Sequence, residues 1–183
     1  MAVRPVLTYP DPRLKAVCRP VECFDEVLAE LVRDLEETMR AGPGGVGIAA
    51  PQVGVPLRVA LVDCSTTRRP VPNHGLMVLV NPEITHWEGM TVGREGCLSV
   101  PDYTGNVIRA ERVRVEAVDV QGRPVAYDCE GYEARAVQHE LDHLDGILFL
   151  DRLVSRRHDL FRRKVYRKPG GAETQPGPRT RRT

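Results

Sequence analysis

Two histidines that stand four residues apart constrain this chain more than any other feature of its sequence. They lie in the segment 138–143, which reads Q-H-E-L-D-H. Positions i and i+4 share one face of an α-helix, so His139 and His143 can reach one ion, with the Glu140 carboxylate beside them. This H-E-x-x-H pattern is typical of a divalent metal site in which the carboxylate acts as a general base. The other interpretation is a chance match on an exposed, salt-bridged helix.

The residues next to this segment favour the metal site. Val137, Leu141 and Leu144 are apolar, and Ala134 and Ala136 are small. The sequence therefore predicts a helix that is packed on more than one side, which a solvated helix would not be.

Length and composition predict a single globular domain. The chain has 183 residues, of which 42% are hydrophobic, enough for a core that folds alone. It has no apolar run of transmembrane length and no signal-peptide segment in residues 1–19, so we expect a cytoplasmic protein without a membrane partner.

The cysteines and the remaining histidines show no pairing pattern. Five cysteines without a C-x-x-C pair argue against a disulfide framework and against a four-cysteine zinc module. Four of them are predicted to be packing residues: Cys18, Cys23, Cys64 and Cys129. Three histidines are predicted to be surface residues: His74, His86 and His158.

Positive charge is concentrated at the C-terminal end. Residues 152–183 carry 11 Lys and Arg against 2 acidic residues, a net charge of +9, whereas residues 1–151 carry 15 and 23, a net charge of −8. Such a basic segment indicates either a polyanionic partner or a solubilising tail, and the two interpretations stay open.

Hydrophobic periodicity and turn residues predict an α+β fold rather than a βαβ series. Helices are expected over residues 24–40, with Asp25 as N-cap, and over 132–144. A C-terminal helix over 153–166 would complete a single catalytic domain of residues 1–166, followed by a disordered basic tail over 167–183. Short strands are expected at residues 57–62, 77–81, 84–87, 106–110, 113–120 and 125–129.

A glycine-rich segment, residues 44–54, reads G-G-V-G-I-A-A-P-Q-V-G. It lacks the spacing of a dinucleotide-binding loop and the G-K-[ST] of a P-loop. Its composition is compatible with a tight structural turn or with close approach of the backbone to a ligand.

A catalytic metal site needs a third protein ligand. Phe149 stands where a third histidine would follow in metzincins, and the acidic residues after Asp145 lie in or near the basic tail. The remaining candidate is Cys97, in the segment E-G-C-L-S of residues 95–99. A thiolate with two imidazoles would make a soft metal site, whereas a lone cysteine is more often an inert buried thiol.

Together, the three segments resemble the peptide deformylase family. Its G-x-G-x-A-A-x-Q, E-G-C-L-S and Q-H-E-x-D-H motifs match residues 45–52, 95–99 and 138–143 in that order, and the similarity runs from about residue 6 to residue 153. The resemblance implies an α+β fold with antiparallel sheets around a central metal-binding helix. An N-terminal and a C-terminal helix complete the expected fold.

The resemblance also implies a reaction. The formyl group of the N-terminal formyl-methionine of new polypeptides would be hydrolysed, and formate would be released. Cys97, His139 and His143 would bind Fe2+, which Zn2+, Ni2+ or Co2+ could replace. Glu140 would act as general base and then general acid as a metal-bound water attacks the formyl carbonyl.

Further roles are implied around this reaction. The Gln52 amide and the Leu98 backbone N–H would hold the oxyanion, and Val46 and Gly47 would pair with the extended substrate. Three residues are expected to support the site: Glu95, Gln138 and Asp142. Asp142 would either accept a hydrogen bond from a ligand imidazole or pair with an arginine.

The methionine pocket is expected to be apolar. Residues near Ile48, Tyr132, Ala136 and Val137 would line it, although Arg135 falls among them.

Some bacterial members of this family dock on the ribosome through a basic C-terminal helix. Five basic residues here would suit rRNA phosphates: Arg156, Arg157, Arg162, Arg163 and Lys164. Two other functions fit the sequence less well. A zincin-type endopeptidase would need a downstream metal ligand, which is missing. A non-catalytic metal- or ribosome-binding protein would be expected to have lost a catalytic group, whereas Gln52, Cys97, Glu140 and both histidines are all present.

Overall fold

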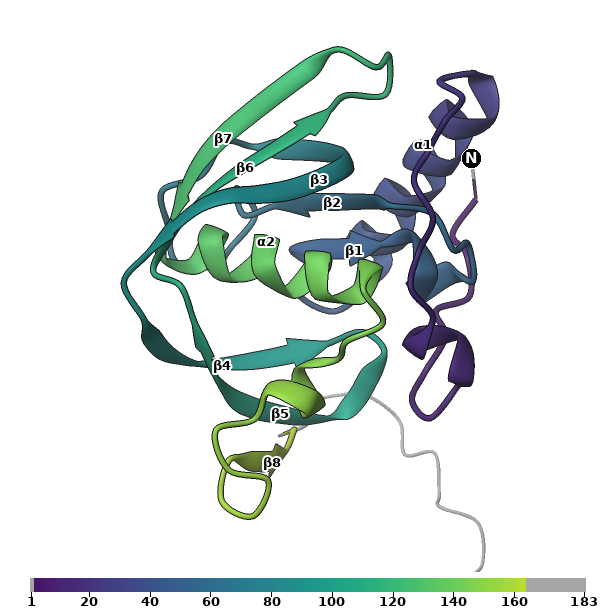
Figure 1. Cartoon of the computed structure of the whole chain (residues 1–183). Helices are drawn as coiled ribbons and strands as arrows, with labels where there is room; N and C mark the ends of the chain where they lie inside the picture. Colours follow the sequence, from purple (N-terminus) through teal and green to yellow (C-terminus); the bar gives the residue numbers. More distant parts are fainter. Residues whose placement is uncertain (1, 164–183) are drawn as a thin grey trace, which may run out of the picture.

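The computed structural model describes residues 2–163, which form two antiparallel sheets with a helix between them (Figure 1). The expected disordered tail and the end of the expected C-terminal helix lie outside these residues. One sheet has the order β1-β2-β3-β6-β7, and the other has the order β4-β5-β8. All of their strand pairs are antiparallel, which confirms the predicted α+β class.

The strands of the larger sheet are β1 (Gly47–Ala49), β2 (Val59–Asp63), β3 (Leu76–Glu88), β6 (Arg112–Val118) and β7 (Pro124–Glu130). Those of the smaller sheet are β4 (Thr91–Cys97), β5 (Val100–Arg109) and β8 (Leu160–Arg162). Three short 3-10 helices, Pro12–Lys15, Ala50–Val53 and Phe149–Arg152, connect these elements.

Helix α1 (Glu26–Ala41) agrees with its sequence pattern. The Asp25 side chain accepts a hydrogen bond from the backbone N–H of Leu28, so the predicted N-cap is confirmed. The apolar face of α1 packs in one cluster with Ile48 of β1 and Leu61 of β2. The helix therefore covers one face of the larger sheet.

Helix α2 (Gly131–Leu144) covers the other face of that sheet. Its Val137 and Leu141 share a buried cluster with Val62 of β2 and Leu79 of β3. Figure 1 shows that the smaller sheet lies on the opposite side of α2. Because α2 is buried from both sides, the alternative of an exposed, salt-bridged helix is wrong.

The strand predictions need correction at three places in the chain. Residues 77–81 and 84–87 belong to one bent strand, β3, in which Asn81 has a φ of 51° and the register with β6 shifts. Strand β4 was missed because its sequence, T-V-G-R-E-G-C, is too polar and glycine-rich to resemble a strand. The glycine-rich segment contains strand β1 rather than only a turn.

The C-terminal helix predicted over residues 153–166 is wrong over its described part. Residues 160–162 form strand β8, which pairs with β5, and the described residues after 153 contain no helix. The backbone N–H of Asn106 donates to the carbonyl oxygen of Asp159, and the Arg94 guanidinium lies 3.5 Å from the centre of the Phe161 ring. These contacts with the sheet override a helical propensity that is only a weak local preference.

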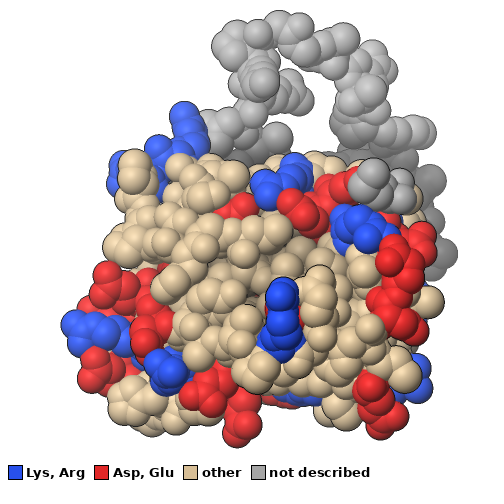
Figure 2. Space-filling view, turned by 90° about the horizontal axis from the view of Figure 1, so that it is seen from above, with Lys and Arg blue, Asp and Glu red and all other residues tan. Residues whose placement is uncertain are grey.

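The surface has two features that bear on function. No helix in the described part of the chain is long and apolar enough to cross a bilayer. Figure 2 shows a face whose central area is mostly uncharged, with a basic side chain within it and both acidic and basic side chains around the rim. This face offers no patch of a single charge sign to a polyanion.

Cys23 is exposed, which corrects its prediction as a packing residue, whereas Cys18, Cys64 and Cys129 are buried as predicted.

Candidate metal centre

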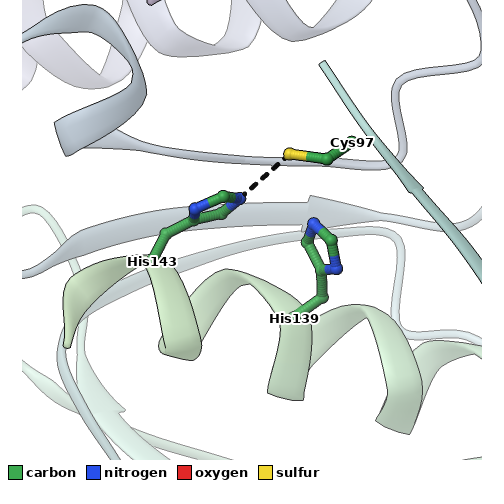
Figure 3. Close-up of side chains that lie close together, drawn as sticks. All are labelled: Cys97, His139 and His143. Atoms are coloured by element: carbon green, nitrogen blue, oxygen red, sulfur yellow. Dashed lines mark hydrogen bonds between the residues drawn. The ribbon is translucent and has the colours of Figure 1, made fainter. Parts of the chain in front are cut away.

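Cys97, His139 and His143 converge on one point between the two sheets (Figure 3). Their potential ligand atoms all lie within 4.8 Å of one another, and the three residues are buried. The Cys97 Sγ atom lies 3.2 Å from Nε2 of His143. The histidines come from successive turns of α2, and the cysteine ends β4, just before the turn into β5.

The Glu95 carboxylate orients the first histidine. Its Oε2 atom lies 2.8 Å from Nδ1 of His139, and the Arg109 guanidinium donates to both carboxylate oxygens, at 2.9 and 3.0 Å. Burial opposes the ionisation of Glu95, but hydrogen bonds from His139 and Arg109 outweigh it and hold the pKa of Glu95 well below its usual range. With its Nδ1 proton directed to Glu95, His139 turns Nε2 toward the cluster.

Asp142 pairs with arginines, which decides between the two roles expected for it. Its Oδ2 atom accepts from Arg109 at 2.6 Å, and its Oδ1 atom accepts from Arg152 at 2.7 Å. Asp142 therefore supports the site through Arg109, which links it to Glu95.

Cys97 lies in surroundings that favour a thiolate. Burial alone would raise its pKa, but the imidazoles of His143 and His139 lower the pKa well below that of an ordinary thiol. The Gln52 amide and the backbone N–H of Ser99 also approach Sγ, at 3.5 and 3.4 Å. Thiolates are the form in which cysteine binds a metal.

Glu140 is a buried carboxylate with an incomplete set of hydrogen bonds. Its Oε2 atom has no hydrogen-bond partner among the described residues, and burial raises its pKa to about 7 despite the nearby His139 and His143. A Cβ atom on Gly47 would lie 2.3 Å from Glu140 Oε1, so only glycine leaves room for this side chain. A soft S-N-N donor set beside an unpaired carboxylate fits a divalent transition metal.

Gln52 is held beside the cysteine by its own amide group. Its Oε1 atom accepts from the backbone N–H of Ala49 at 2.9 Å, and its Nε2 atom lies 3.1 Å from Ser99 Oγ. The amide N–H group therefore faces the cluster with a fixed orientation.

A pocket of about 230 Å³ opens onto these residues. Val46, Gly47 and Leu98 line it together with His139 and Glu140, whereas His143 lies deeper. The pocket is thus lined by residues from all three sequence segments.

Two of the four residues expected near an apolar methionine pocket lie at the candidate pocket. Tyr132 and Ala136 line the pocket, but Ile48 and Val137 are fully buried in the core. Arg135 also lines it, and its guanidinium donates to Glu95 Oε1 at 3.0 Å and to two backbone carbonyl oxygens. One wall is therefore an ion pair where an apolar surface was expected.

Two supporting residues were missed from the sequence, Arg109 and Ser99. Arg109 interrupts an otherwise apolar strand pattern between Ile108 and Ala110, which could have suggested a buried cation with acidic partners. Ser99 offers no comparable signal, because its contact with Gln52 depends on how the 3-10 helix Ala50–Val53 approaches the turn between β4 and β5.

The chain is similar to known proteins over most of its length. Residues 3–159 match the family described as polypeptide deformylase. A peptide deformylase of Alkalilimnicola ehrlichii is 46% identical over 165 residues, which cover 90% of each chain. A class I type b peptide deformylase of Acinetobacter baumannii, crystallised with Met-Ala-Ser bound, has a TM-score of 0.78 and 42% identity, covering 82% of this chain and 98% of that one. The peptide deformylase of Ehrlichia chaffeensis in complex with actinonin has a TM-score of 0.79 and 35% identity, covering 86% and 92%. The chain belongs to the polypeptide deformylase family.

Proposed function

We propose that this chain is a metal-dependent hydrolase that removes the formyl group from the N-terminal formyl-methionine of new polypeptides. Membership of the family carries the reaction itself. The observation that carries the mechanism is the convergence of Cys97, His139 and His143 on one point, with Glu140 unpaired beside them.

Cys97, His139 and His143 are the proposed ligands of one divalent ion. We assign Fe2+, with Zn2+, Ni2+ or Co2+ as substitutes, because thiolate and imidazole donors suit these ions better than Mg2+ or Ca2+. When bound, such an ion supplies a Lewis acid and lowers the pKa of water toward neutrality.

Glu140 is the proposed proton carrier. It accepts a proton from water and delivers it to the α-amino nitrogen as the formyl C–N bond breaks, leaving formate and a free N-terminus. A pKa near 7 suits both halves of this transfer, because the group must gain and lose a proton at the same pH.

Gln52 and Leu98 are the proposed oxyanion donors. The Gln52 amide is fixed by Ala49 and Ser99, so it would need no reorientation as negative charge develops on the formyl oxygen. Leu98 lies in the turn that follows Cys97 and lines the same pocket.

The substrate is proposed to extend the larger sheet at β1. This strand lies at the edge of its sheet, and the carbonyl oxygen of Val46 accepts from the N–H of Asp63, toward β2. Strand alternation directs the N–H and C=O of Gly47 to the open side, where an extended peptide can pair with them. The A. baumannii relative bound to Met-Ala-Ser supports a short peptide as the ligand.

A cytoplasmic location and a ribosome contact stay predictions. Of the basic residues expected to face rRNA, Arg156, Arg157 and Arg162 are exposed, and Lys164 lies outside the described residues. Arg163 is engaged elsewhere, because its guanidinium donates to the carbonyl oxygen of Cys97 at 3.4 Å and lines the candidate pocket.

The test compares a formylated peptide with an unformylated one. Protein purified without oxygen is assayed for formate release from formyl-Met-Ala-Ser and for cleavage of an unformylated peptide at internal bonds. Formate release without internal cleavage is expected. Internal cleavage without formate release would favour the endopeptidase, and a metal-loaded protein without either activity would favour a binding protein.

A further inference from the structure

A second cluster of metal-ligating side chains lies apart from the candidate centre. His74 comes from the connection between β2 and β3, Cys129 from the end of β7, and Glu133 from the first turn of α2. Their potential ligand atoms all lie within 4.8 Å of one another. This cluster shares no residue with the first, and Glu133 precedes His139 by six positions on α2, roughly 9 Å along the helix axis.

Glu133 is the centre of this cluster. Its side chain is 1% exposed, and among the described residues no Arg or Lys lies within ion-pair distance of it. Its Oε1 atom accepts from the backbone N–H of His74 at 2.8 Å, and its Oε2 atom lies 2.8 Å from Nδ1 of the same residue. One oxygen of the buried carboxylate is therefore fixed by a backbone N–H, and the other oxygen faces the His74 imidazole, which can bind a cation.

The two partners of Glu133 complete a mixed donor set. The Cys129 thiol is buried and within hydrogen-bonding reach of Glu133, and the His74 imidazole is 40% exposed. His74 lines a surface pocket of about 460 Å³ together with Cys129 and Glu133, which leaves an open side for a fourth ligand. Burying a carboxylate beside a thiol, without an arginine or a lysine, is costly unless a cation compensates the charge.

We propose that His74, Cys129 and Glu133 form a second site for a divalent ion of the Zn2+ class. One sulfur, one nitrogen and one oxygen donor, with the fourth position open to solvent, suit a four-coordinate ion of borderline softness. Binding releases the Cys129 thiol proton to solvent, and His74 keeps its remaining proton on Nε2. The backbone N–H of His74 holds the second carboxylate oxygen in place, as supporting groups around metal ligands do.

The position of the site suggests a structural role. An ion there would tie the connection between β2 and β3 to β7 and α2. That connection carries Thr66 and Arg69, which line a groove with Val46 and Tyr132, two residues of the candidate pocket. The second site would therefore fix one wall beside the first.

A competing interpretation is a hydrogen-bonded cluster that needs no ion. In that case the His74 imidazole and the Cys129 thiol only satisfy Glu133. The two interpretations differ in the number of ions that the protein holds.

The test counts ions in the full-length protein. Chelator-treated, reduced protein is dialysed against Co2+ without oxygen, and bound cobalt is measured per chain. Wild type is expected to hold two ions, and His74→Ala and Cys129→Ser to hold one each. Matched controls, His86→Ala from the same pocket and Cys64→Ser from the same core cluster, are expected to hold two. Two ions in His74→Ala or in Cys129→Ser would overturn the proposal.

A second measurement separates the two sites. In Cys97→Ser the first site loses its thiolate, so a cobalt–thiolate charge-transfer band must come from Cys129. We expect this band in Cys97→Ser and its loss in Cys97→Ser/Cys129→Ser. Its absence from Cys97→Ser would refute the second site, whatever metal the first site binds.

Discussion

Glu95 links the buried charges under the candidate metal centre. The Arg109 guanidinium joins the Glu95 carboxylate to Asp142, and the Arg135 guanidinium donates to Glu95 Oε1. Such a buried network is costly to desolvate, so its stabilising value depends on every partner being present. The hydrogen bond between Glu95 and His139 orients a candidate metal ligand, which is a reason for burying charged side chains here instead of apolar ones.

Replacing Arg109 by methionine should be strongly destabilising. The substitution leaves Glu95 and Asp142 buried without their shared cation, and breaking a buried pair in this way costs about 3–5 kcal/mol. Urea unfolding measures the loss. Arg112→Met, which removes an exposed pair with Glu88, is the control and should leave the unfolding midpoint nearly unchanged. Equal effects of the two substitutions would contradict a buried network.

Glu140 should make the stability of the metal-free protein depend on pH. Its pKa of about 7 in the folded state exceeds the ordinary value of 4.5, so between these values the folded state holds a proton that the unfolded state has lost. Stability contributed by the protonated group is complete below pH 4.5 and falls as pH rises to about 7. Each unit of pKa corresponds to about 1.4 kcal/mol, so the loss is a few kcal/mol.

Glu140→Gln removes this titration. The free energy of unfolding of the metal-free variant, minus that of wild type, should therefore increase between pH 4.5 and 7 and then level off. A difference that stays constant across this window would mean that Glu140 is not a buried carboxyl group with a raised pKa.

At the scale of elements, the edge strand β1 and helix α2 define the space around the site. They meet where Gly47 faces Glu140, and the missing side chain of Gly47 is what allows the carboxylate to approach. Among the described residues, the same strand lies at the edge of its sheet, where an extended peptide is proposed to pair with it.

Gly47→Ala should therefore impair turnover more than folding. The added Cβ atom would lie 2.3 Å from Glu140 Oε1 and would displace the carboxylate. A displacement of about 1 Å at a reacting group can cost on the order of a hundredfold in rate. Formate release measures this loss, while metal content on the same sample should be unchanged. A variant with wild-type turnover would show that the close contact is not needed.

Helix α1 depends on its N-cap for a measurable part of its stability. Asp25→Ala removes the side-chain acceptor of the Leu28 N–H and should destabilise the protein by about 1 kcal/mol. Thermal unfolding is the measurement. Glu30→Ala, at an exposed position of the same helix, is the control and should change stability much less.

These elements also mark how far the sequence alone could lead. Helices α1 and α2 were predictable because caps and apolar periodicity are local signals, and the spacing of His139 and His143 follows from helix geometry alone. Strand β4 was not predictable because its sequence is polar and glycine-rich, and strand β8 was not predictable because its partner β5 is distant in sequence. Arg109 was missed for the same reason, because its acidic partners come from β4 and α2.

At the scale of the whole molecule, the candidate centre joins the two layers of the fold. Cys97 comes from the smaller sheet, and both histidines come from a helix that packs on the larger one (Figures 1 and 3). A ligand that binds only the folded state stabilises it, and an ion held here would cross-link both sheets through α2. The same ion would also supply the Lewis acid for the proposed hydrolysis.

The proposed metal-dependent mechanism is tested most directly by an anaerobic Fe2+ titration of the chelator-treated protein, with formate release from formyl-Met-Ala-Ser and bound iron measured on each sample. Wild type should release formate in proportion to the iron bound at Cys97, His139 and His143. Glu140→Gln should bind the same iron and lose roughly a hundredfold or more in rate, the usual contribution of a general acid–base group. Release by the iron-free protein would show that the reaction does not need the metal, and full activity of Glu140→Gln would show that this carboxylate does not carry the proton.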